Sequence, residues 1–521
     1  MSLFSNVLGQ SPARLVQAGV ALAAAAFFAG CGNSYRPVIT PINPTGPAAQ
    51  PTSYAVVVSS PAANAAGIVT VLDYSGDSIL TQAPIGPNPF AFTLDANGSN
   101  GFTVNSDHTL TNFQVSNSQP QEKNIYYSTL PPTAQTVGLF APVAGLWSPD
   151  LNGNVIDVLA ITGSAEAFKL SVPVATTPVA VVGVGSLGQH IYSISQNVPF
   201  DVACNNAPAS AAQVGEADAL EVTSFTVSAR IPVGKCPVYG VSSPDGRRVF
   251  VLNRGSDTVT VINSQNNTLD QCPVPLVPLP PSNLPSCPPP YNTNQNGQPI
   301  TYHPDLPLSL TAVNALNAAT PGSGNPPNGT AGMPTVAGPV YAEFIPSTQQ
   351  LVVADYDGGT ITLIDVSLDE YGNDSPTFGT TFTIPVGHNP AGVTVLADGS
   401  RAYTADQSDG TVHVVNLSSH TVEKTLTVTG HPRSVVSTSN SLYGKVYVTS
   451  PDSTFLTIIR TDQDIVDTTV LIEGNLVDVR VTSQSTSRGN TNISSRIPGG
   501  GQPCYRPGPV TSLADCQNIH P

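Results

Sequence analysis

Short runs of β-branched and aromatic residues alternate with polar turns along most of this chain, and the pattern repeats. The segments 248–263, 350–365, 401–416 and 445–460 align with one another. Each has an apolar strand, a polar turn and a second strand in which β-branched and polar positions alternate, with no helical period. A unit that recurs at about 45–50 residues is typical of the blades of a β-propeller.

Eight such units can be counted. We label the strands of a blade A to D from the central channel outward, so that each unit supplies strands B and C. The expected B strands begin near Tyr54, Gly101, Val155, His190, Arg248, Leu351, Ala402 and Val446, and the expected C strands near Val69, Leu110, Ala165, Leu220, Val259, Ile361, Val412 and Leu456. The third and fourth units are weak, so seven blades is the alternative. The sequence therefore predicts an all-β fold over residues 54–482, a single β-propeller of seven or eight four-stranded blades.

The two ends of this region predict how the ring closes. The chain enters it at a B-type strand and leaves it at 479–482, a segment with the pattern of an A-type strand. The last segment would then complete the blade that Tyr54 opens. Such closure removes the free sheet edges that an open array would expose.

Two kinds of turn recur between the strands. The segments 243–246 and 397–400 carry Asp-Gly before a B strand. The segments 86–89, 234–237, 387–390 and 430–432 begin with glycine and end with proline before an A strand. Glycine accepts a positive φ, and proline presets the residue that enters the strand, so both residue types suit these positions.

These turns, together with the strands 249–253, 261–263 and 447–450 and the segments 231–234 and 384–387, resemble the YVTN β-propeller repeat family. The resemblance is specific over 228–482 and faint over 54–227. It implies a propeller fold and a group of mostly uncharacterised exported proteins. It implies no defined catalytic set.

The N-terminus predicts export. Arg14 precedes an apolar, alanine-rich run over 15–30, which is typical of a signal peptide. The run ends at Phe28-Ala-Gly-Cys31, which resembles the lipobox of bacterial lipoproteins, although Phe28 departs from the usual Leu. We therefore predict a lipoprotein signal peptide over 1–30 and lipidation of Cys31, with an ordinary secretory signal as the alternative. Gly32 favours the outer membrane or the periplasmic face over the inner membrane.

Residues 31–53 would form a tether. This stretch is rich in proline and favours extended conformers rather than a core. A lipid on Cys31 would thus hold the propeller off a membrane surface, and the lipid would be its only membrane contact.

The remaining cysteines fit an oxidising compartment. Cys204, Cys236, Cys272, Cys287, Cys504 and Cys516 are even in number and can form three disulfides in fifteen arrangements. Locality favours 272–287 and 504–516, which leaves 204–236. Free buried cysteines are the alternative, and the absence of a Cys-x-x-Cys pair disfavours zinc.

Two segments interrupt the repeat. Residues 266–338 are rich in Pro, Asn and Gly, and we expect them to form a loop insertion on the face opposite the B–C turns. Long loops of this kind are either functional or disordered. Residues 483–521 are polar and carry no repeat, so an irregular C-terminal tail is expected there.

Charge narrows the class of partner. Only 10% of residues are charged and the formal net charge is −16. A phosphate backbone would repel such a protein, so we predict no nucleic acid partner. The single Trp147 argues against a carbohydrate-binding surface lined with indoles.

The mouth of the channel is the candidate ligand site. In a propeller the D–A and B–C turns share one face, which would gather Lys235, His388, His431 and Arg433 with Asp355, Asp357, Asp406 and Asp409. Mixed charge at a concave mouth is a starting hypothesis for a binding site. The alternative is that aspartate is frequent in turns because its side chain bonds to the backbone.

Known catalytic and metal motifs are missing. The segments 355–358 and 150–154 begin like calcium loops but lack the downstream Glu, and His413 is expected to pack within a strand. No nucleophile elbow, zinc-protease motif or phosphate-binding loop occurs. We predict no metal, no cofactor and no catalytic residue.

The favoured function is a monomeric, lipid-anchored binding scaffold that uses its loop face to bind a protein, glycan or small molecule. The alternative is a lactonase-like or other hydrolase with a site at the channel mouth. A redox propeller is weaker, because no Cys-x-x-Cys-His occurs. Fold analogy alone does not decide among these.

Overall fold

The computed structural model describes residues 53–482, with gaps at 63–64, 74–75, 96–97, 116–124, 137, 142–144, 163–164, 185–189, 200–203, 205–213, 280–283, 294–296, 298, 309–335, 370–372 and 439–443. The predicted signal peptide, Cys31, nearly all of the tether, the tail and Cys504 and Cys516 lie outside the described residues. Among the residues that are described, no helix is long and apolar enough to cross a membrane.

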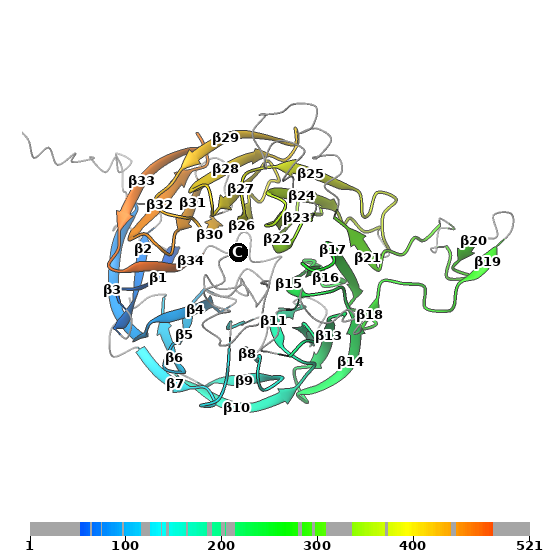
Figure 1. Ribbon diagram of the computed structural model, residues 1–521, viewed down its shortest axis with the longest axis horizontal. Helices are drawn as coiled ribbons and strands as arrows, with labels where there is room; N and C mark the ends of the chain where they lie inside the picture. Colours follow the sequence, from blue (N-terminus) through cyan, green and yellow to red (C-terminus); the bar gives the residue numbers. More distant parts are fainter. Residues whose placement is uncertain are drawn as a thin grey trace, which may run out of the picture. The chain divides into compact units, whose positions relative to one another are not determined.

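In the described part of the chain, eight sheets follow one another around a ring, so the fold is an eight-bladed β-propeller (Figure 1). Blade 1 consists of β34 (Asn475–Val481), β1 (Tyr54–Ser60), β2 (Ala66–Asp73) and β3 (Ser78–Pro87), and blade 2 of β4 (Pro89–Leu94), β5 (Asn100–Asn105), β6 (Thr109–Gln114) and β7 (Ile125–Thr129). Blade 3 consists of β8 (Leu146–Asp150), β9 (Val155–Thr162) and β10 (Ala165–Pro173). Blade 4 consists of β11 (Pro178–Gly183), β12 (His190–Ser195), β13 (Glu216–Glu221) and β14 (Thr226–Pro232).

Blades 5 to 8 carry the clearest sequence repeats. Blade 5 consists of β15 (Pro237–Ser242), β16 (Arg248–Asn253), β17 (Thr258–Asn263), β18 (Thr268–Leu269) and β21 (Asp305–Pro307), and blade 6 of β22 (Pro339–Ile345), β23 (Gln350–Asp355), β24 (Thr360–Asp365) and β25 (Thr381–Pro385). Blade 7 consists of β26 (Pro390–Val395), β27 (Arg401–Asp406), β28 (Thr411–Asn416) and β29 (Thr421–Thr427). Blade 8 consists of β30 (Ser434–Ser437), β31 (Lys445–Thr449), β32 (Phe455–Arg460) and β33 (Ile465–Leu471).

The ring closes as the sequence predicts. The last strand, β34, pairs antiparallel with the first, β1, in a register that sets Ala55 opposite Val481 and Val57 opposite Val479. Blade 1 is therefore built from both ends of the propeller segment. Because this pairing occupies the edge of β1, no blade is left open at the junction.

Blade 3 departs from the expected assignment. The strands predicted as B and C, near Val155 and Ala165, are β9 and β10, which occupy positions C and D, and strand B is β8. Position A is held by an irregular segment that forms only isolated bridges with β8, at Thr136 and Phe140. Because apolar and polar residues do not alternate regularly in this inner segment, the sequence pattern assigns the strands of blade 3 one position too far inward.

The insertion leaves blade 5 from the middle of its outer strand. Both β18 and β21 pair with β17, and Asp270 and Pro304 bond to the two sides of Val261. The two short strands thus act as one strand D, interrupted by the residues between them. From there the chain extends outward to the hairpin of β19 (Val277–Leu279) and β20 (Leu284–Ser286) (Figure 1). The described part of the insertion therefore projects from the rim, and not from the face opposite the B–C turns.

Two disulfides match the predicted pairing. Cys272–Cys287 closes the base of the hairpin, and Cys204–Cys236 joins the connection after β12 to the turn before β15. Cys204 and Cys236 are both fully buried.

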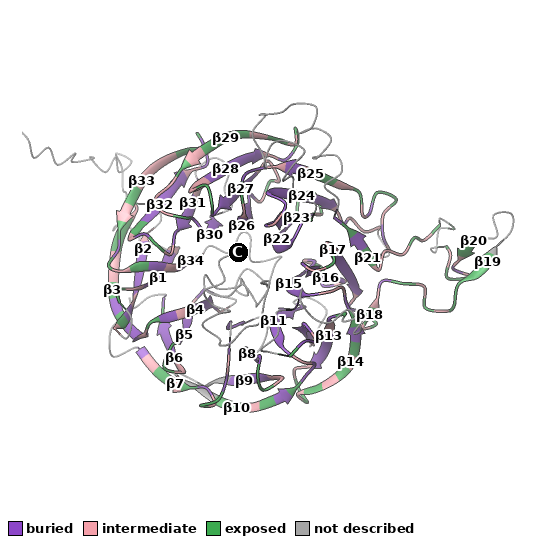
Figure 2. Ribbon diagram, viewed as in Figure 1, coloured by how far each residue is buried: buried purple, intermediate pink, exposed green. Residues whose placement is uncertain are grey.

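The core lies between neighbouring blades. Inner strands are mostly buried, whereas the residues of outer strands such as β29 and β33 are exposed or half-buried (Figure 2). Tyr239 of blade 5 packs on Tyr341 of blade 6, with ring centroids 5.0 Å apart. Apolar clusters of this kind run from each sheet into the next, so the blades are stable only as a set.

In blades 7 and 8, a basic residue at the start of strand B forms an ion pair with the next blade. Arg401 bonds Asp464 at 3.0 Å, and Lys445 pairs with Asp77 across the junction between blades 8 and 1. Both aspartates lie in C–D turns and have positive φ. These repeated contacts define the role of the corresponding Arg248, discussed below.

Candidate functional site

The D–A and B–C turns lie on one face of the ring, which we call the turn face. In blade 5 the amide of Lys235, in the D–A turn, donates to Ser256 Oγ at 3.1 Å, and Gly255 N donates to Lys235 O at 3.0 Å. The two kinds of turn are therefore hydrogen-bonded to each other within a blade. All eight residues predicted for the channel mouth lie in these turns or in the strand ends beside them.

Glycine and proline in the D–A turns have separate structural reasons. In three of these turns the positive φ falls on the residue directly before proline, at Asn88, Cys236 and Asn389, whereas in the shorter turn 430–432 it falls on the leading Gly430. The leading glycine is needed for space, because a Cβ on Gly86 would lie 2.0 Å from Asn105 Nδ2. The end of strand B packs directly against the turn that follows the preceding blade.

Two predicted histidines form equivalent pairs in neighbouring blades. In blade 7, the amide of His388 donates to Asp409 Oδ2 at 2.9 Å, and its ring Nδ1 lies 2.8 Å from Asp409 Oδ1. In blade 8, the amide of His431 donates to Asp452 Oδ1 at 2.8 Å, and its Nδ1 lies 2.6 Å from Asp452 Oδ2. A carboxylate only accepts, so each Nδ1 donates and each neutral ring keeps Nε2 as an acceptor.

Both pairs are accessible. The side chain of His431 is 61% exposed and that of His388 is 46% exposed. Burial alone would raise the pKa of Asp452, but the hydrogen bonds from His431 outweigh it and lower this pKa. Asp452 was not among the predicted residues. The repeat alone does not identify it, because Asp452 aligns with Ser408, one position before Asp409.

Asp355 and Asp406 end their B strands inside the protein, where neither is exposed to solvent. Asp355 Oδ2 accepts from Thr360 Oγ1 at 3.1 Å and from Thr362 Oγ1 at 2.6 Å. Burial outweighs these bonds and raises the pKa of Asp355 to about 7.

Asp406 is held in the same way, by Thr404 and by the ring of His413. Burial raises its pKa as well, against the hydrogen bonds from His413 and Thr404. Asn253 occupies the equivalent place in blade 5 and donates to Thr260 Oγ1 at 2.8 Å. These strand ends therefore join strand B to strand C within a blade.

Asp357 is committed to a neighbouring blade. Arg254 Nε and Nη2 donate to its two carboxylate oxygens at 2.9 and 2.8 Å, from the B–C turn of blade 5 to that of blade 6. The Arg254 guanidinium also lies over the ring of Tyr356, 5.2 Å from its centroid. The bidentate pair fixes the spacing of the two turns.

Arg433 and Lys235 are the predicted cations that remain. Both side chains are partly exposed, and neither forms an ion pair within the described part of the chain. Burial lowers the pKa of Arg433 to about 10, although Tyr356 and Asp478 act in the opposite direction. The predicted mouth thus separates into internal aspartates, two exposed His–Asp pairs and two cations without a carboxylate partner.

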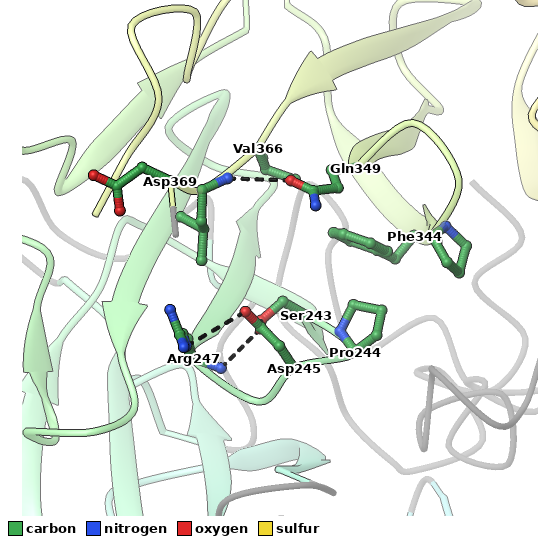
Figure 3. Close-up of a pocket in the computed structure, with 10 residues that line it drawn as sticks. Ser243, Pro244, Asp245, Arg247, Phe344, Gln349, Val366 and Asp369 are labelled. Atoms are coloured by element: carbon green, nitrogen blue, oxygen red, sulfur yellow. Dashed lines mark hydrogen bonds and ion pairs between the residues drawn. The ribbon is translucent and has the colours of Figure 1, made fainter. Parts of the chain in front are cut away.

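A pocket of about 290 Å³ lies on the opposite face, between the A–B turns of blades 5 and 6 (Figure 3). Phe344, Val366 and Leu368 supply its apolar wall, and Arg247 and Asp245 border it. Its volume is at the lower end of the range for small-molecule sites, about 300–1,000 Å³. No sequence motif marks this pocket, because it is formed where turns of two blades meet.

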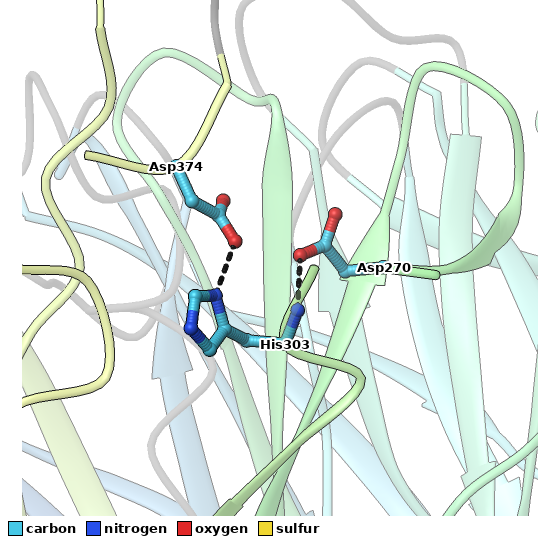
Figure 4. Close-up of side chains that lie close together, drawn as sticks. All are labelled: Asp270, His303 and Asp374. Atoms are coloured by element: carbon cyan, nitrogen blue, oxygen red, sulfur yellow. Dashed lines mark hydrogen bonds and ion pairs between the residues drawn. The ribbon is translucent and has the colours of Figure 1, made fainter. Parts of the chain in front are cut away.

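Beside this region Asp270, His303 and Asp374 come together, with ligand atoms within 4.8 Å of one another (Figure 4). His303 Nδ1 lies 2.8 Å from Asp374 Oδ2, and its amide donates to Asp270 Oδ2 at 3.1 Å. Burial raises the pKa of Asp270 to about 7, with Arg248 acting against it and Asp374 adding to it.

Arg248 decides how this cluster is understood. Its Nη2 lies 3.2 Å from Asp270 Oδ1 and 3.1 Å from Asp374 Oδ1, and the guanidinium is buried. A fixed positive charge between both carboxylates takes the place that a metal cation would need. The cluster is therefore the blade 5 form of the basic fastening seen at Arg401, extended so that it also holds the two ends of the insertion.

Comparisons with known proteins place the fold but not the function. No protein-family model matches the chain, and no curated protein matches it. Apo AztD from Citrobacter koseri is 13% identical, with a TM-score of 0.50, over 82% of this chain and 97% of that chain.

Two enzymes or putative enzymes share the architecture at similar distance. The dihydro-heme d1 dehydrogenase NirN is 12% identical, with a TM-score of 0.52, over 86% of this chain and 78% of that chain. A putative 6-phosphogluconolactonase from Bacteroides fragilis is 12% identical, with a TM-score of 0.48, over 84% of this chain and 99% of that chain. At such identities the likeness shows a shared propeller fold alone.

Proposed function

We propose that this protein is an exported β-propeller of the YVTN repeat type, anchored through a lipid on Cys31, which binds a partner at its turn face without catalysing a reaction. The signal-like N-terminus and the proline-rich stretch after it support export and anchoring. The closed ring supports a scaffold, because every blade presents turns on the same face.

The repeated His–Asp pair of blades 7 and 8 is the observation that carries this proposal. Most polar side chains of the turn face are used within the fold, whereas His388 and His431 are exposed and held by two hydrogen bonds each. Side chains fixed before binding lose little conformational entropy on complex formation. Each ring offers Nε2 to a donor group of a partner.

A hydrolase is the second candidate, because a His–Asp pair can also act as a general base. Such an enzyme would need a metal or a converging acid–base set at the mouth. Among the described residues, the group of three metal-ligating side chains lies at Asp270, His303 and Asp374, around Arg248 on the opposite face. The binding scaffold is therefore preferred.

Site-specific photo-crosslinking in the producing cells tests the binding role. A photoreactive amino acid at position 388 or 431 should give a defined adduct, and one at position 462, in a C–D turn on the opposite face, should not. Adducts at all three positions, or at none, would contradict the proposal. Turnover of lactones or esters that is lost in H388A/H431A would favour the hydrolase instead.

Anchoring is tested separately. The C31S variant should leave the membrane fraction and lose incorporation of a labelled fatty acid, with the propeller still folded. Retention of label in C31S would exclude Cys31 as the lipidated residue.

A further inference from the structure

Arg433 differs from every other described arginine in having no carboxylate partner. The others each lie 3.7 Å or less from a carboxylate oxygen: Arg230, Arg247, Arg248, Arg254, Arg401, Arg460 and Arg480. In a chain with a formal net charge of −16, carboxylates are plentiful, so this exception is unusual. A partly buried cation without a partner is costly unless something else neutralises it.

The sequence marks the same position as exceptional. In five other blades, the residue directly after the turn proline is apolar: Phe90, Val179, Val238, Val340 and Ala391. In blade 8 it is Arg433, which follows Pro432. The backbone at this place accepts an apolar side chain in these five blades, so the fold does not require a guanidinium there.

Arg433 lies directly before β30, at the turn-face end of the inner strand of blade 8. Arg433 belongs to blade 8, yet the groups that act on its charge are Tyr356 of blade 6 and Asp478 of blade 1. Asp478 is already engaged, since Arg480 Nη2 lies 2.8 Å from its Oδ2 and Ser434 donates to its Oδ1. Asp478 therefore does not serve as the ion-pair partner of Arg433.

Nearby aspartates of the turn face are also engaged. Asp357 binds Arg254, Asp409 binds His388 and Asp452 binds His431. Glu473 is exposed in the turn before β34, and it makes no ion pair with Arg433. The described protein thus supplies no anion for this guanidinium.

We propose that Arg433 is an anion-binding residue at the channel mouth and that it takes the carboxylate of a small-molecule ligand. A guanidinium presents two parallel N–H donors that match the two oxygens of a carboxylate. A single unpaired arginine fits one monoanionic group. This inference rests on the proposed binding role of the turn face and names the chemistry of one ligand group.

Calorimetric titration of the full chain with benzoate, at constant ionic strength set by chloride, tests the proposal. The wild type should bind benzoate more tightly than inorganic phosphate, and R433V should lose at least tenfold in affinity. R433V should fold, because valine stands at this position in three other blades. In buffer without carboxylate it should melt no lower than the wild type, because it removes an unpaired charge.

Arg230 provides the matched control. It lies on the outer strand of blade 4, paired with Glu216, so R230Q makes the same change in net charge far from the channel. R230Q should bind benzoate as the wild type does. Equal affinity in R433V and the wild type, equal loss in R230Q, or no binding by the wild type would each overturn the proposal.

The carboxylate could also come from the chain's own C-terminal tail, 483–521, which contains one aspartate, Asp515. If the wild type binds no benzoate and D515N does, Asp515 is the occupant and a free ligand is excluded. Failure of the anion-site proposal can be distinguished from failure of the proposed binding role. If benzoate binding does not depend on Arg433 while adducts at positions 388 and 431 persist in R433V, the binding role stands and the anion site is rejected.

Discussion

Tyr54 and Thr482 are 428 positions apart in the chain and are hydrogen-bonded to each other in blade 1. The amide of Tyr54 donates to Thr482 Oγ1 at 2.7 Å, and the amide of Thr482 donates to Tyr54 O at 2.9 Å. These bonds continue the ladder between β1 and β34. The ring is therefore held shut by contacts between the two ends of the propeller segment.

Removing β34 should abolish folding of the ring. A chain that stops at Gly474 loses the inner strand of blade 1, including the fully buried Leu476 and Val479, and exposes the edge of β1. We expect aggregation, measured by size-exclusion chromatography. A chain that stops after Thr482 keeps all of the pairing and should remain monomeric with a cooperative melt. A monomeric, cooperatively melting chain without β34 would show that closure is dispensable.

The two disulfides should differ in their effect on stability. Cys204–Cys236 is buried at the ring and spans 32 residues, so C204S/C236S should lower the free energy of unfolding by about 3–4 kcal/mol. Cys272–Cys287 closes the projecting hairpin, so C272S/C287S should leave the melting of the ring unchanged. Chemical denaturation of both variants measures this difference. Equal losses would show that the hairpin is coupled to the ring.

The repeat could be followed in the sequence only where apolar and polar residues alternate regularly along the strands. Blades 5 to 8 were recovered because their B and C strands are continuous, and closure followed from counting strands at the two ends. In blade 3 the inner strand is replaced by an irregular segment that only bridges β8, so the assignment shifted by one strand. The sequence also did not show that the insertion leaves blade 5 at the rim, because two short segments, β18 and β21, together form one outer strand.

His413 is expected to stabilise blade 7 through Asp406. Removing the ring in H413A leaves a fully buried carboxylate with one fewer donor, and should cost about 3 kcal/mol of unfolding free energy. H413T should cost less, because Thr362 fills the same place beside Asp355 in blade 6. Thermal and urea unfolding of the two variants measures the difference. If H413A and H413T unfold alike, the ring contributes by packing and not by its hydrogen bond.

Stability should fall as pH rises from about 4 to 7. Burial raises the pKa of Asp355 and Asp218 to about 7, and that of Asp157 to about 6, against an unfolded value of about 3.9. The folded chain thus holds more protons than the unfolded chain in this window, and its stability is lost as pH rises through the folded pKa values. D355N should flatten the pH dependence, and asparagine already stands at this place in blade 5 as Asn253.

D462N supplies a control of opposite sign. A hydrogen bond from Arg460 lowers the pKa of Asp462, so its contribution is present above the unfolded pKa and is lost as pH falls. Removing it should lower stability by a similar amount at pH 5.5, 7 and 8 and by less at pH 4, where part of the contribution is already lost. Urea denaturation at pH 4, 5.5, 7 and 8 measures both variants. An unchanged slope in D355N would show that Asp355 is not protonated near neutral pH.

The site was predictable in position but not in pairing. Turn order placed all eight predicted residues at the turn face, because propeller topology fixes which turns share a face. It did not show that Asp355 and Asp406 turn inward onto Thr362 and His413, since B-strand ends and turn tips look alike in sequence. Arg433 could be distinguished only by comparison with the apolar residues that follow the turn proline in other blades.

Because the outer strand of blade 5 is split into β18 and β21, the chain can be lengthened there without changing the size of the ring. Because β18 and β21 stay in register with β17 on either side of Val261, residues can be added between them without altering blade number or spacing. Blade 5 is thus a natural attachment point for cargo. An unrelated domain grafted between Cys272 and Cys287 would be carried outward from the rim, clear of the turn face.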